Sequence, residues 1–218
     1  MNVRALRLCF VTNLQNKPFH LYKPIILQAI EGGITSLQLR LKANQTETLA
    51  IARELKPLLD YYHIPLIIND DVEIARLLKA HLHIGPTDMS VREARKILGK
   101  DAMIGLSIET LDELDAANKL SGNYYVAASA VFRSKTKATK TIWQIAGLKK
   151  ITAESALPVM GIGGITEHNV GEVIEAGAIG AAVIGAIHDS PYPTIAAANM
   201  LSKIDEALNA RSRPCLRR

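Results

Sequence analysis

The chain has 218 residues, of which 48% are hydrophobic and 22% are charged, and it is long enough to bury one sizeable core. Plentiful apolar residues exclude a mainly disordered protein, while 14 glycines and two cysteines exclude collagen-like chains and disulfide scaffolds. Lys and Arg outnumber Asp and Glu by 26 to 21, but four of these bases lie in the last eight residues.

Residues 211–218 are therefore expected to form a basic, disordered tail after a single domain at 1–210. Aromatic residues make up 5% of the chain and are scattered, which argues against nucleic-acid binding. The longest apolar run, at 176–187, is too short to span a membrane. Two cysteines, far apart and in no metal-binding pattern, favour a cytoplasmic protein without a zinc site. The sequence allows a homo-oligomer without requiring one.

Short apolar, β-branched runs predict the strands. They lie at 6–12, 36–41, 65–69, 81–84, 103–107, 124–127, 158–161 and 180–184. Their starts are about 25 residues apart, which suits one strand followed by one crossover helix. Helices are expected at 46–62, from a capping box at Ser90 to Leu98, at 110–119 and at 167–175. Eight such units predict an α/β protein with a single-domain (β/α)8 TIM barrel fold.

In a barrel of this kind, the carboxyl ends of the strands carry the active site. The second strand ends with Gln38, Arg40 and Lys42 at alternate positions. Inward-facing bases are costly unless they meet an anion, so the pattern points to a phosphate group. The alternative is a pair of bases that reach out to solvent.

Carboxylates follow the third and fourth strands. Asn69 and Asp70 end the third strand, and Asp88 lies shortly after the fourth. Carboxylates at neighbouring strand ends can hold one Mg²⁺ together with phosphate oxygens. Because each precedes a helix, helix N-capping is the alternative.

Hydroxyl groups and bases follow the fifth and sixth strands. Ser107 is either a hydroxyl donor or a turn residue. The segment 129–140 holds four bases and several hydroxyl groups, among them Ser134, Thr136 and Lys137. Such a loop can close over phosphates and exclude water, or it is a solvated run of charge.

Glycines follow the last two strands. The turn at 161–166 contains Gly163 and leads into an expected helix, and Ile184 and Gly185 follow the eighth strand. Exposed backbone N–H groups next to a helix N-terminus favour a phosphate, and barrels commonly bind phosphate at this position. The alternative is that the glycines only make tight turns.

Taken in order, these strand ends resemble the thiamine-phosphate synthase family. The matching motifs are Gln38-Leu39-Arg40-x-Lys42, Ile68-Asn69-Asp70, His83-Ile84-Gly85-x-x-Asp88-Met89, Gly105-x-Ser107, Val131-Phe132-x-Ser134-x-Thr136-Lys137 and Gly163-Gly164-Ile165-Thr166. The resemblance runs from Leu8 to Leu208. It implies a (β/α)8 barrel and an enzyme that joins a pyrimidine pyrophosphate to a thiazole phosphate, through a carbocation-like pyrimidine species.

The resemblance also implies roles for the site residues. Asp70 and Asp88 would hold Mg²⁺. The catalytic groups around the pyrophosphate would be Arg40, Lys42, Ser107 and Lys137, with Asn69 beside them. Gln38 would lie near the pyrimidine, Ser134 and Thr136 would line the loop over the substrates, and Gly163, Ile184 and Gly185 would receive the thiazole phosphate. The expected partners are these two small-molecule substrates.

Three positions depart from the family pattern. The family usually has His where this chain has Glu109, and Ser where it has Gly185. The segment 129–134 lacks the two prolines that the family usually has there. These changes bear on efficiency and substrate affinity more than on the class of reaction.

Two other functions fit the same barrel. A thiazole tautomerase related to the synthases relies on the His that Glu109 replaces, and it lacks full pyrophosphate and metal machinery. A non-catalytic barrel that senses a phosphate ligand would need no metal. Glu109, together with Asp70, Asp88 and Lys137, argues against the tautomerase, and the expected Mg²⁺ ligands Asp70 and Asp88 argue against the sensor.

Overall fold

The computed structural model of the protein describes residues 3–14, 18–41, 44–134 and 141–212. Its strands are β1 (Leu8–Val11), β2 (Ser36–Leu39), β3 (Leu66–Asn69), β4 (His81–Ile84), β5 (Ile104–Ile108), β6 (Tyr124–Ser129), β7 (Val159–Ile162) and β8 (Gly180–Val183). Its helices are the 3₁₀ helix η1 (Val3–Leu6) and the α-helices α1 (Phe19–Glu31), α2 (Gln45–Tyr61), α3 (Val72–Leu77), α4 (Val91–Leu98), α5 (Leu111–Asn118), α6 (Gln144–Glu154), α7 (Val170–Glu175), α8 (Gly185–His188) and α9 (Pro193–Ser212).

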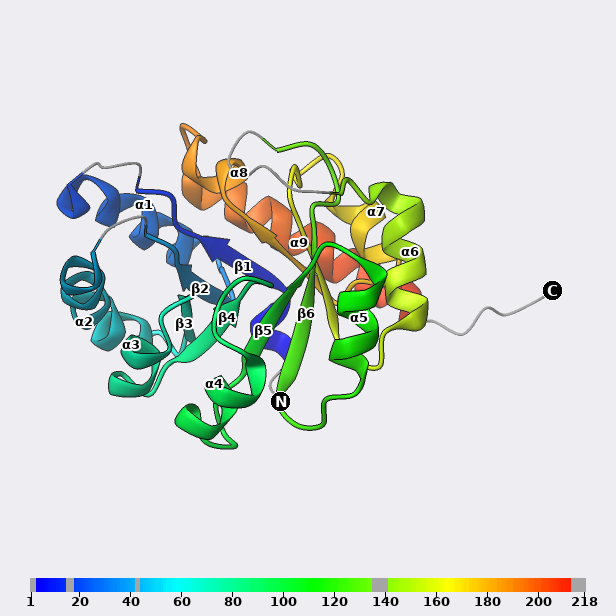
Figure 1. Cartoon of the computed structure of the whole chain (residues 1–218). Coiled ribbons are helices and arrows are strands. Elements are labelled where there is room, and N and C mark those ends of the chain that lie inside the picture. Colours follow the sequence, from blue (N-terminus) through cyan, green and yellow to red (C-terminus); the bar gives the residue numbers. More distant parts are fainter. Residues whose placement is uncertain (1–2, 15–17, 42–43, 135–140, 213–218) are drawn as a thin grey trace.

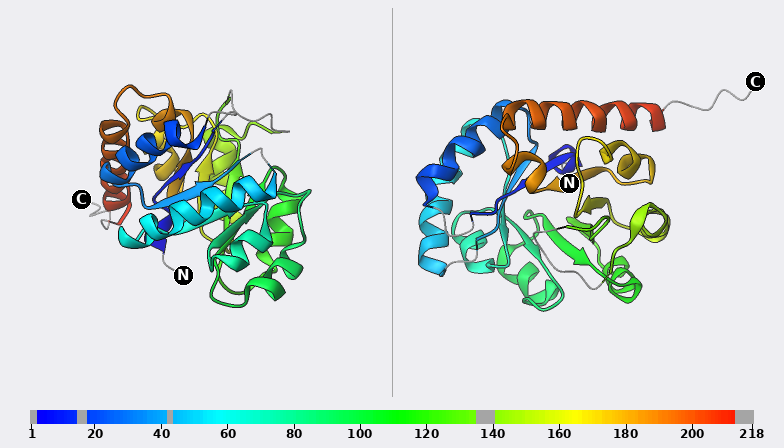
Figure 2. Two further views of the ribbon diagram at one scale, coloured as in Figure 1. Left: turned by 90° about the vertical axis from the view of Figure 1, so that its left-hand side faces the viewer. Right: turned by 90° about the horizontal axis from the view of Figure 1, so that it is seen from above.

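The eight strands form a closed barrel in which each strand is parallel to the next. The barrel closes between β1 and β8, where Cys9 is opposite Ala182. Gly180 permits this closure, because a Cβ there would lie 2.6 Å from the Cα of Arg7. Helices surround the strands, as the views in Figures 1 and 2 show. The predicted (β/α)8 barrel is therefore confirmed.

Alternate strand residues face two separate cores, as expected for a barrel. The barrel interior is filled by Leu6, Cys9, Val11, Ile67, Met103, Tyr125, Met160 and Ala182. The larger core lies between strands and helices, and includes Phe10, Leu37 and Ile68. This double burial explains why the strands read as continuous apolar runs.

Local capping fixes where several helices begin. The hydroxyl of Ser90 accepts from the N–H of Glu93 (3.3 Å), and Thr110 forms a full capping box with Glu113. The predicted starts of α4 and α5 are thereby confirmed.

The expected start of a helix at Glu167 is wrong, because α7 begins at Val170. The Asn169 side chain accepts from the N–H of Thr166 (2.8 Å) and donates to the carbonyl of Gly164 (3.1 Å). These bonds hold 166–169 as a turn, so the glycine turn does not run directly into a helix.

At the other end of the chain, α9 continues to Ser212. The Arg211 guanidinium donates to the carbonyls of Ile174 (2.8 Å) and Ala178 (2.7 Å). The expected boundary after residue 210 therefore falls within the last turn of α9, and residues 213–218 of the predicted tail lie outside the described residues.

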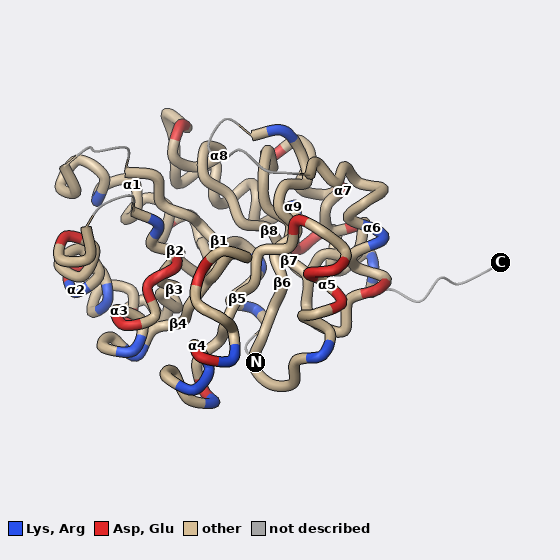
Figure 3. Tube along the Cα trace, in the orientation of Figure 1, with Lys and Arg blue, Asp and Glu red and all other residues tan. Residues whose placement is uncertain are grey.

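Charged residues of both signs are spread over the outer helices (Figure 3). Within the described ranges, no helix is both long and apolar enough to cross a membrane.

Candidate active site

The carboxyl ends of the strands line a cavity of about 570 Å³ at one end of the barrel. Ten of the thirteen residues predicted from the sequence lie in its wall. They are Gln38, Arg40, Asn69, Asp70, Asp88, Ser107, Ser134, Gly163, Ile184 and Gly185. The other three, Lys42, Thr136 and Lys137, lie outside the described residues. The geometry thus brings these ten residues together, while the role of each residue stays a prediction.

Two hydrogen bonds to Thr12, the residue after β1, hold the backbone at the end of β2. Thr12 Oγ1 accepts from the Arg40 N–H (2.9 Å) and donates to the Arg40 carbonyl (3.0 Å). Gln38 is 2% exposed, and its Nε2 has no hydrogen-bond partner among the described residues. Buried polar groups are normally hydrogen-bonded, because an unpaired one costs free energy. The two N–H donors of Gln38 Nε2 are therefore suited to bind a ligand in this cavity.

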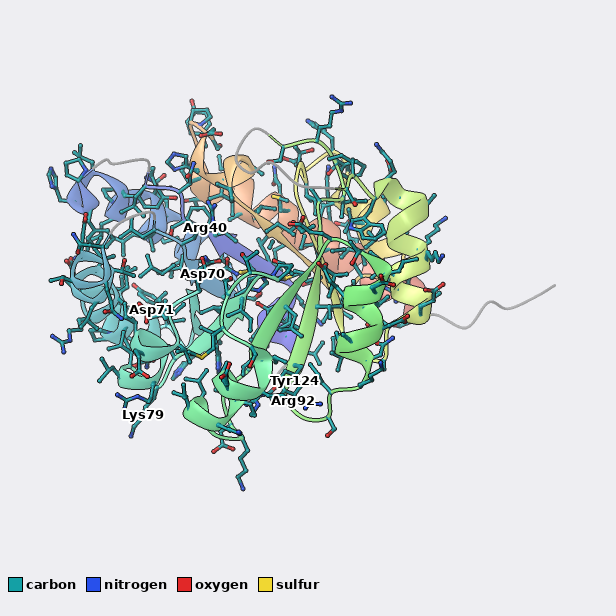
Figure 4. The ribbon with its side chains drawn as sticks, viewed as in Figure 1. Arg40, Asp70, Asp71, Lys79, Arg92 and Tyr124 are labelled. Atoms are coloured by element: carbon teal, nitrogen blue, oxygen red, sulfur yellow. The ribbon has the colours of Figure 1, made fainter. Side chains whose placement is uncertain are left out.

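The carboxylates come from two adjacent strands. Asp70 follows β3 with a φ of +69°, and its N–H donates to the His83 carbonyl (2.8 Å). Asp88 Oδ2 accepts from the N–H of Gly85 (2.6 Å), which folds the β4 loop so that the carboxyl group stays at the cavity. Asp88 is thus not a helix cap, since Ser90 caps α4. Figure 4 places Arg40 and Asp70 close together at this edge.

This donor set can be compared with the needs of a metal ion. Among the residues that the structure describes, no group of three or more His, Cys, Asp or Glu side chains is poised to hold a metal. Mg²⁺ commonly binds through one or two carboxylates and completes its shell with water and phosphate oxygens. Asp70 and Asp88 fit that requirement, and they would not suit Zn²⁺, which prefers His and Cys.

The glycine turn packs beneath the loop that follows β6. Gly163 has a φ of +97° and Gly164 a φ of +62°, and a Cβ on Gly164 would lie 2.7 Å from the Cβ of Phe132. The Phe132 N–H donates to the Gly163 carbonyl (3.0 Å). In the described structure, neither glycine N–H donates to a protein acceptor. These glycines are therefore needed for packing and leave two donors for an anion.

The cavity wall also contains residues that were not among the predicted site residues. They are His83, Glu109, Arg133, Thr166 and Asp189. His83 had a usable signal, because His81 and His83 are two residues apart and so share one face of β4, opposite the apolar face of Leu82 and Ile84. Asp189 had none, because it approaches Gly185 only through the turn of α8.

A closed parallel barrel whose strand ends bring carboxylates, a guanidinium and a glycine turn to one cavity is typical of enzymes that act on phosphorylated small molecules. The family described as thiamine monophosphate synthase matches residues 8–187. The chain belongs to this family, and it is therefore a transferase of thiamine biosynthesis.

Named relatives agree with the family. A thiamine-phosphate synthase of Chlamydia caviae is 38% identical over 205 residues, which cover 93% of this chain and 96% of that protein. Its counterpart in Vibrio parahaemolyticus is also 38% identical, covering 93% of this chain and 100% of that protein.

Among solved structures, a thiamine phosphate pyrophosphorylase from Pyrococcus furiosus matches with a TM-score of 0.84 and 29% identity, covering 94% of this chain and 98% of that one. A 3-hexulose-6-phosphate synthase matches with a TM-score of 0.71, covering 90% of this chain and 99% of that one. At 14% identity, this second likeness shows the fold alone.

Proposed function

We propose that this cavity joins a pyrimidine pyrophosphate to a thiazole phosphate, giving thiamine phosphate and pyrophosphate. One observation supports the proposal: the cavity wall contains two groups of residues that suit an anion. The first group is Arg40 with Asp70 and Asp88, and the second is the glycine turn with Ile184 and Gly185. A diphosphate with a metal suits the first, and a monophosphate without one suits the second.

The reaction needs charge stabilisation more than a protein nucleophile. The bond between the pyrimidinylmethyl carbon and the pyrophosphate oxygen breaks, and its electron pair leaves with the pyrophosphate. The thiazole nitrogen then uses its lone pair to form the new C–N bond. Arg40 and the Ser107 hydroxyl stabilise the negative charge that builds on the departing oxygens, because fixed donors gain strength where charge develops. Lys42 and Lys137, both outside the described residues, are assigned to the same task by the family resemblance.

Mg²⁺ would be held by Asp70 and Asp88, and when bound it would neutralise part of the phosphate charge. Asn69 lies beside Asp70 and offers an amide to the same anion. On the other side of the cavity, the N–H groups of Gly163 and Gly164 bind the thiazole phosphate and so hold the nucleophile in place.

Gln38 recognises the pyrimidine. Its unpaired Nε2 donates to a ring nitrogen, and its amide oxygen can accept from an exocyclic amine. Ser134 lies in the cavity wall, and the family resemblance assigns it, with Thr136 outside the described residues, to a loop over the substrates. We further propose a cytoplasmic location, which the sparse cysteine content supports.

The deciding experiment is a coupling assay with both phosphorylated substrates and Mg²⁺. Thiamine phosphate and pyrophosphate should appear in equal amounts, and omission of either substrate should abolish both products. Binding of the thiazole phosphate without any product would contradict the proposal and favour a phosphate-binding barrel.

A further inference from the structure

Three side chains on neighbouring strands form a hydrogen-bonded chain from the cavity into the barrel interior. Ser107 Oγ on β5 lies 3.0 Å from His83 Nε2 on β4, and His83 Nδ1 lies 3.0 Å from the Tyr125 hydroxyl on β6. Ser107 and His83 line the cavity, whereas Tyr125 is fully buried in the interior core. We propose that Tyr125 is a positioning residue, which acts through His83 to aim the Ser107 hydroxyl hydrogen at the substrate. The inference rests on the proposed function.

The barrel leaves room for this contact at one position. In the strand register, His83 is opposite Gly105, and Gly105 is opposite Tyr125. A Cβ on Gly105 would lie 2.5 Å from His83 Nδ1 and would also collide with the Tyr125 ring. Because Gly105 on β5 has no side chain, the Tyr125 side chain on β6 can extend over it and contact His83 on β4.

The direction of the hydrogen bonds follows from the burial of Tyr125. Burial raises the pKa of this phenol well above its usual value, so it keeps its proton. Within the described part of the chain, its hydroxyl has one hydrogen-bonding partner, His83 Nδ1. If Nδ1 carried a proton, the phenolic hydrogen would be buried with no acceptor among the described residues, which costs free energy.

The tautomer of His83 decides what Ser107 can do. With Tyr125 donating to Nδ1, the neutral ring carries its proton on Nε2 and donates it to Ser107 Oγ. The Ser107 hydroxyl hydrogen is then directed away from the histidine, and it can form a hydrogen bond to a departing pyrophosphate oxygen. In the other tautomer, Ser107 would donate to Nε2 and would present only lone pairs to an anion.

Substitution of Tyr125 by Phe tests the inference through the coupling rate. Tyr125→Phe keeps the ring but removes the donor to Nδ1, and we expect kcat to fall about fivefold to tenfold, from the loss of one hydrogen bond. Ser107→Ala should cost more, and Tyr125→Phe should then have no further effect in the Ser107→Ala background. Multiplying effects in the double variant would overturn the inference, because they would show that Tyr125 acts independently of Ser107.

Tyr124→Phe is the matched control. Tyr124 is the next residue along β6, and its hydroxyl accepts from Arg95 Nε (2.9 Å). Its ring belongs to the larger core between strands and helices. We expect this variant to lose stability without losing kcat. An equal loss of kcat in Tyr124→Phe and Tyr125→Phe would overturn the inference, because any buried hydroxyl would then serve.

The second readout does not depend on activity. In ¹⁵N-labelled wild-type protein at neutral pH, the His83 ring, identified by the signals lost in His83→Gln, should show Nε2 protonated and Nδ1 bare. Nδ1 protonation would overturn the inference even if the enzyme couples its substrates. If the wild type forms no thiamine phosphate, the proposed function fails, while the tautomer still tests the hydrogen-bonded chain.

Discussion

Asp70 and Asp71 are adjacent in the chain but serve different parts of the structure. Asp70 lines the cavity, whereas Asp71 caps α3 by accepting from the N–H of Ile74 (2.9 Å). Asp71 also accepts from Gln45 Nε2 (3.0 Å), which ties it to α2. The positive φ of Asp70 marks the point where the chain leaves β3 for the cap, and it separates the two carboxylates.

This pair gives a direct test of the metal site. Asp70→Asn keeps a residue type that tolerates a positive φ but removes the charge, so we expect the Mg²⁺ concentration for half-maximal coupling to rise more than about tenfold. Asp88→Asn should behave alike, since its amide oxygen can still accept from Gly85. A titration of coupling rate against Mg²⁺ measures both.

Asp71→Ala serves as the control for that titration. It should lower the unfolding free energy by about 1 kcal/mol, the usual cost of a lost cap, and leave the Mg²⁺ requirement unchanged. Full activity of the wild type in excess chelator would contradict the metal assignment, whatever the variants do.

Gln38→Met separates recognition from folding. The side chain keeps its length, and the lost Nε2 has no partner among the described residues, so the melting temperature should stay the same or rise. The KM for the pyrimidine pyrophosphate should rise about tenfold or more, because a hydrogen-bonding site rejects a ligand that it can no longer pair with. A drop in melting temperature with unchanged KM would show that Gln38 is a structural residue.

The two glycine sites should respond differently to a side chain. Gly163 has a positive φ, and a Cβ there would collide with Ala130, so Gly163→Ala should destabilise the protein by about 1–3 kcal/mol and raise the KM for the thiazole phosphate. Among the described residues, a Cβ at Gly185 meets only the Asp189 carboxylate, with Oδ2 at 2.7 Å, and that side chain is 73% exposed.

Gly185→Ser should therefore fold with little loss of stability, because the exposed Asp189 carboxylate can move aside. The added hydroxyl can donate to the phosphate, and we expect the KM for the thiazole phosphate to fall. Thermal melting and steady-state kinetics on both glycine variants check this contrast. Equal destabilisation at the two positions would contradict it.

Alkaline pH should weaken the fold through the barrel interior. Burial raises the pKa of the Cys9 thiol from 9.0 to about 11, so the folded protein keeps a proton that the unfolded chain loses. The contribution is fully present below pH 9 and is lost as the pH rises to about 11, which amounts to about 3 kcal/mol.

Denaturant unfolding between these pH values measures the slope. In Cys9→Ala, the unfolding free energy should fall by about 3 kcal/mol less between pH 9 and 11 than in the wild type. The substitution also removes some packing, and that loss is the same at every pH. Burial also raises the pKa of Tyr22 and Tyr125, so a slope of the same sign should persist in the variant. An unchanged slope in Cys9→Ala would show that the thiol does not titrate differently in the two states.

The sequence by itself determined the barrel and ten of the residues in the cavity wall. Apolar runs at regular spacing define the strands, and a closed parallel barrel brings every strand's carboxyl end to one rim. Residues as distant as Gln38, Asp88 and Gly185 could therefore be assigned to one site from their positions at strand ends alone. Capping at Ser90 and Thr110 was equally readable, because these bonds are local.

Only the tertiary structure decided how residues meet across the barrel. The contact of His83 with Tyr125 requires the register that places Gly105 between them, and no local pattern encodes that register. The start of α7 likewise depends on the bonds of Asn169 to the turn before it. The sequence placed residues at the rim through strand periodicity, whereas side-chain contacts depend on strand stagger and barrel closure, which only the folded chain supplies.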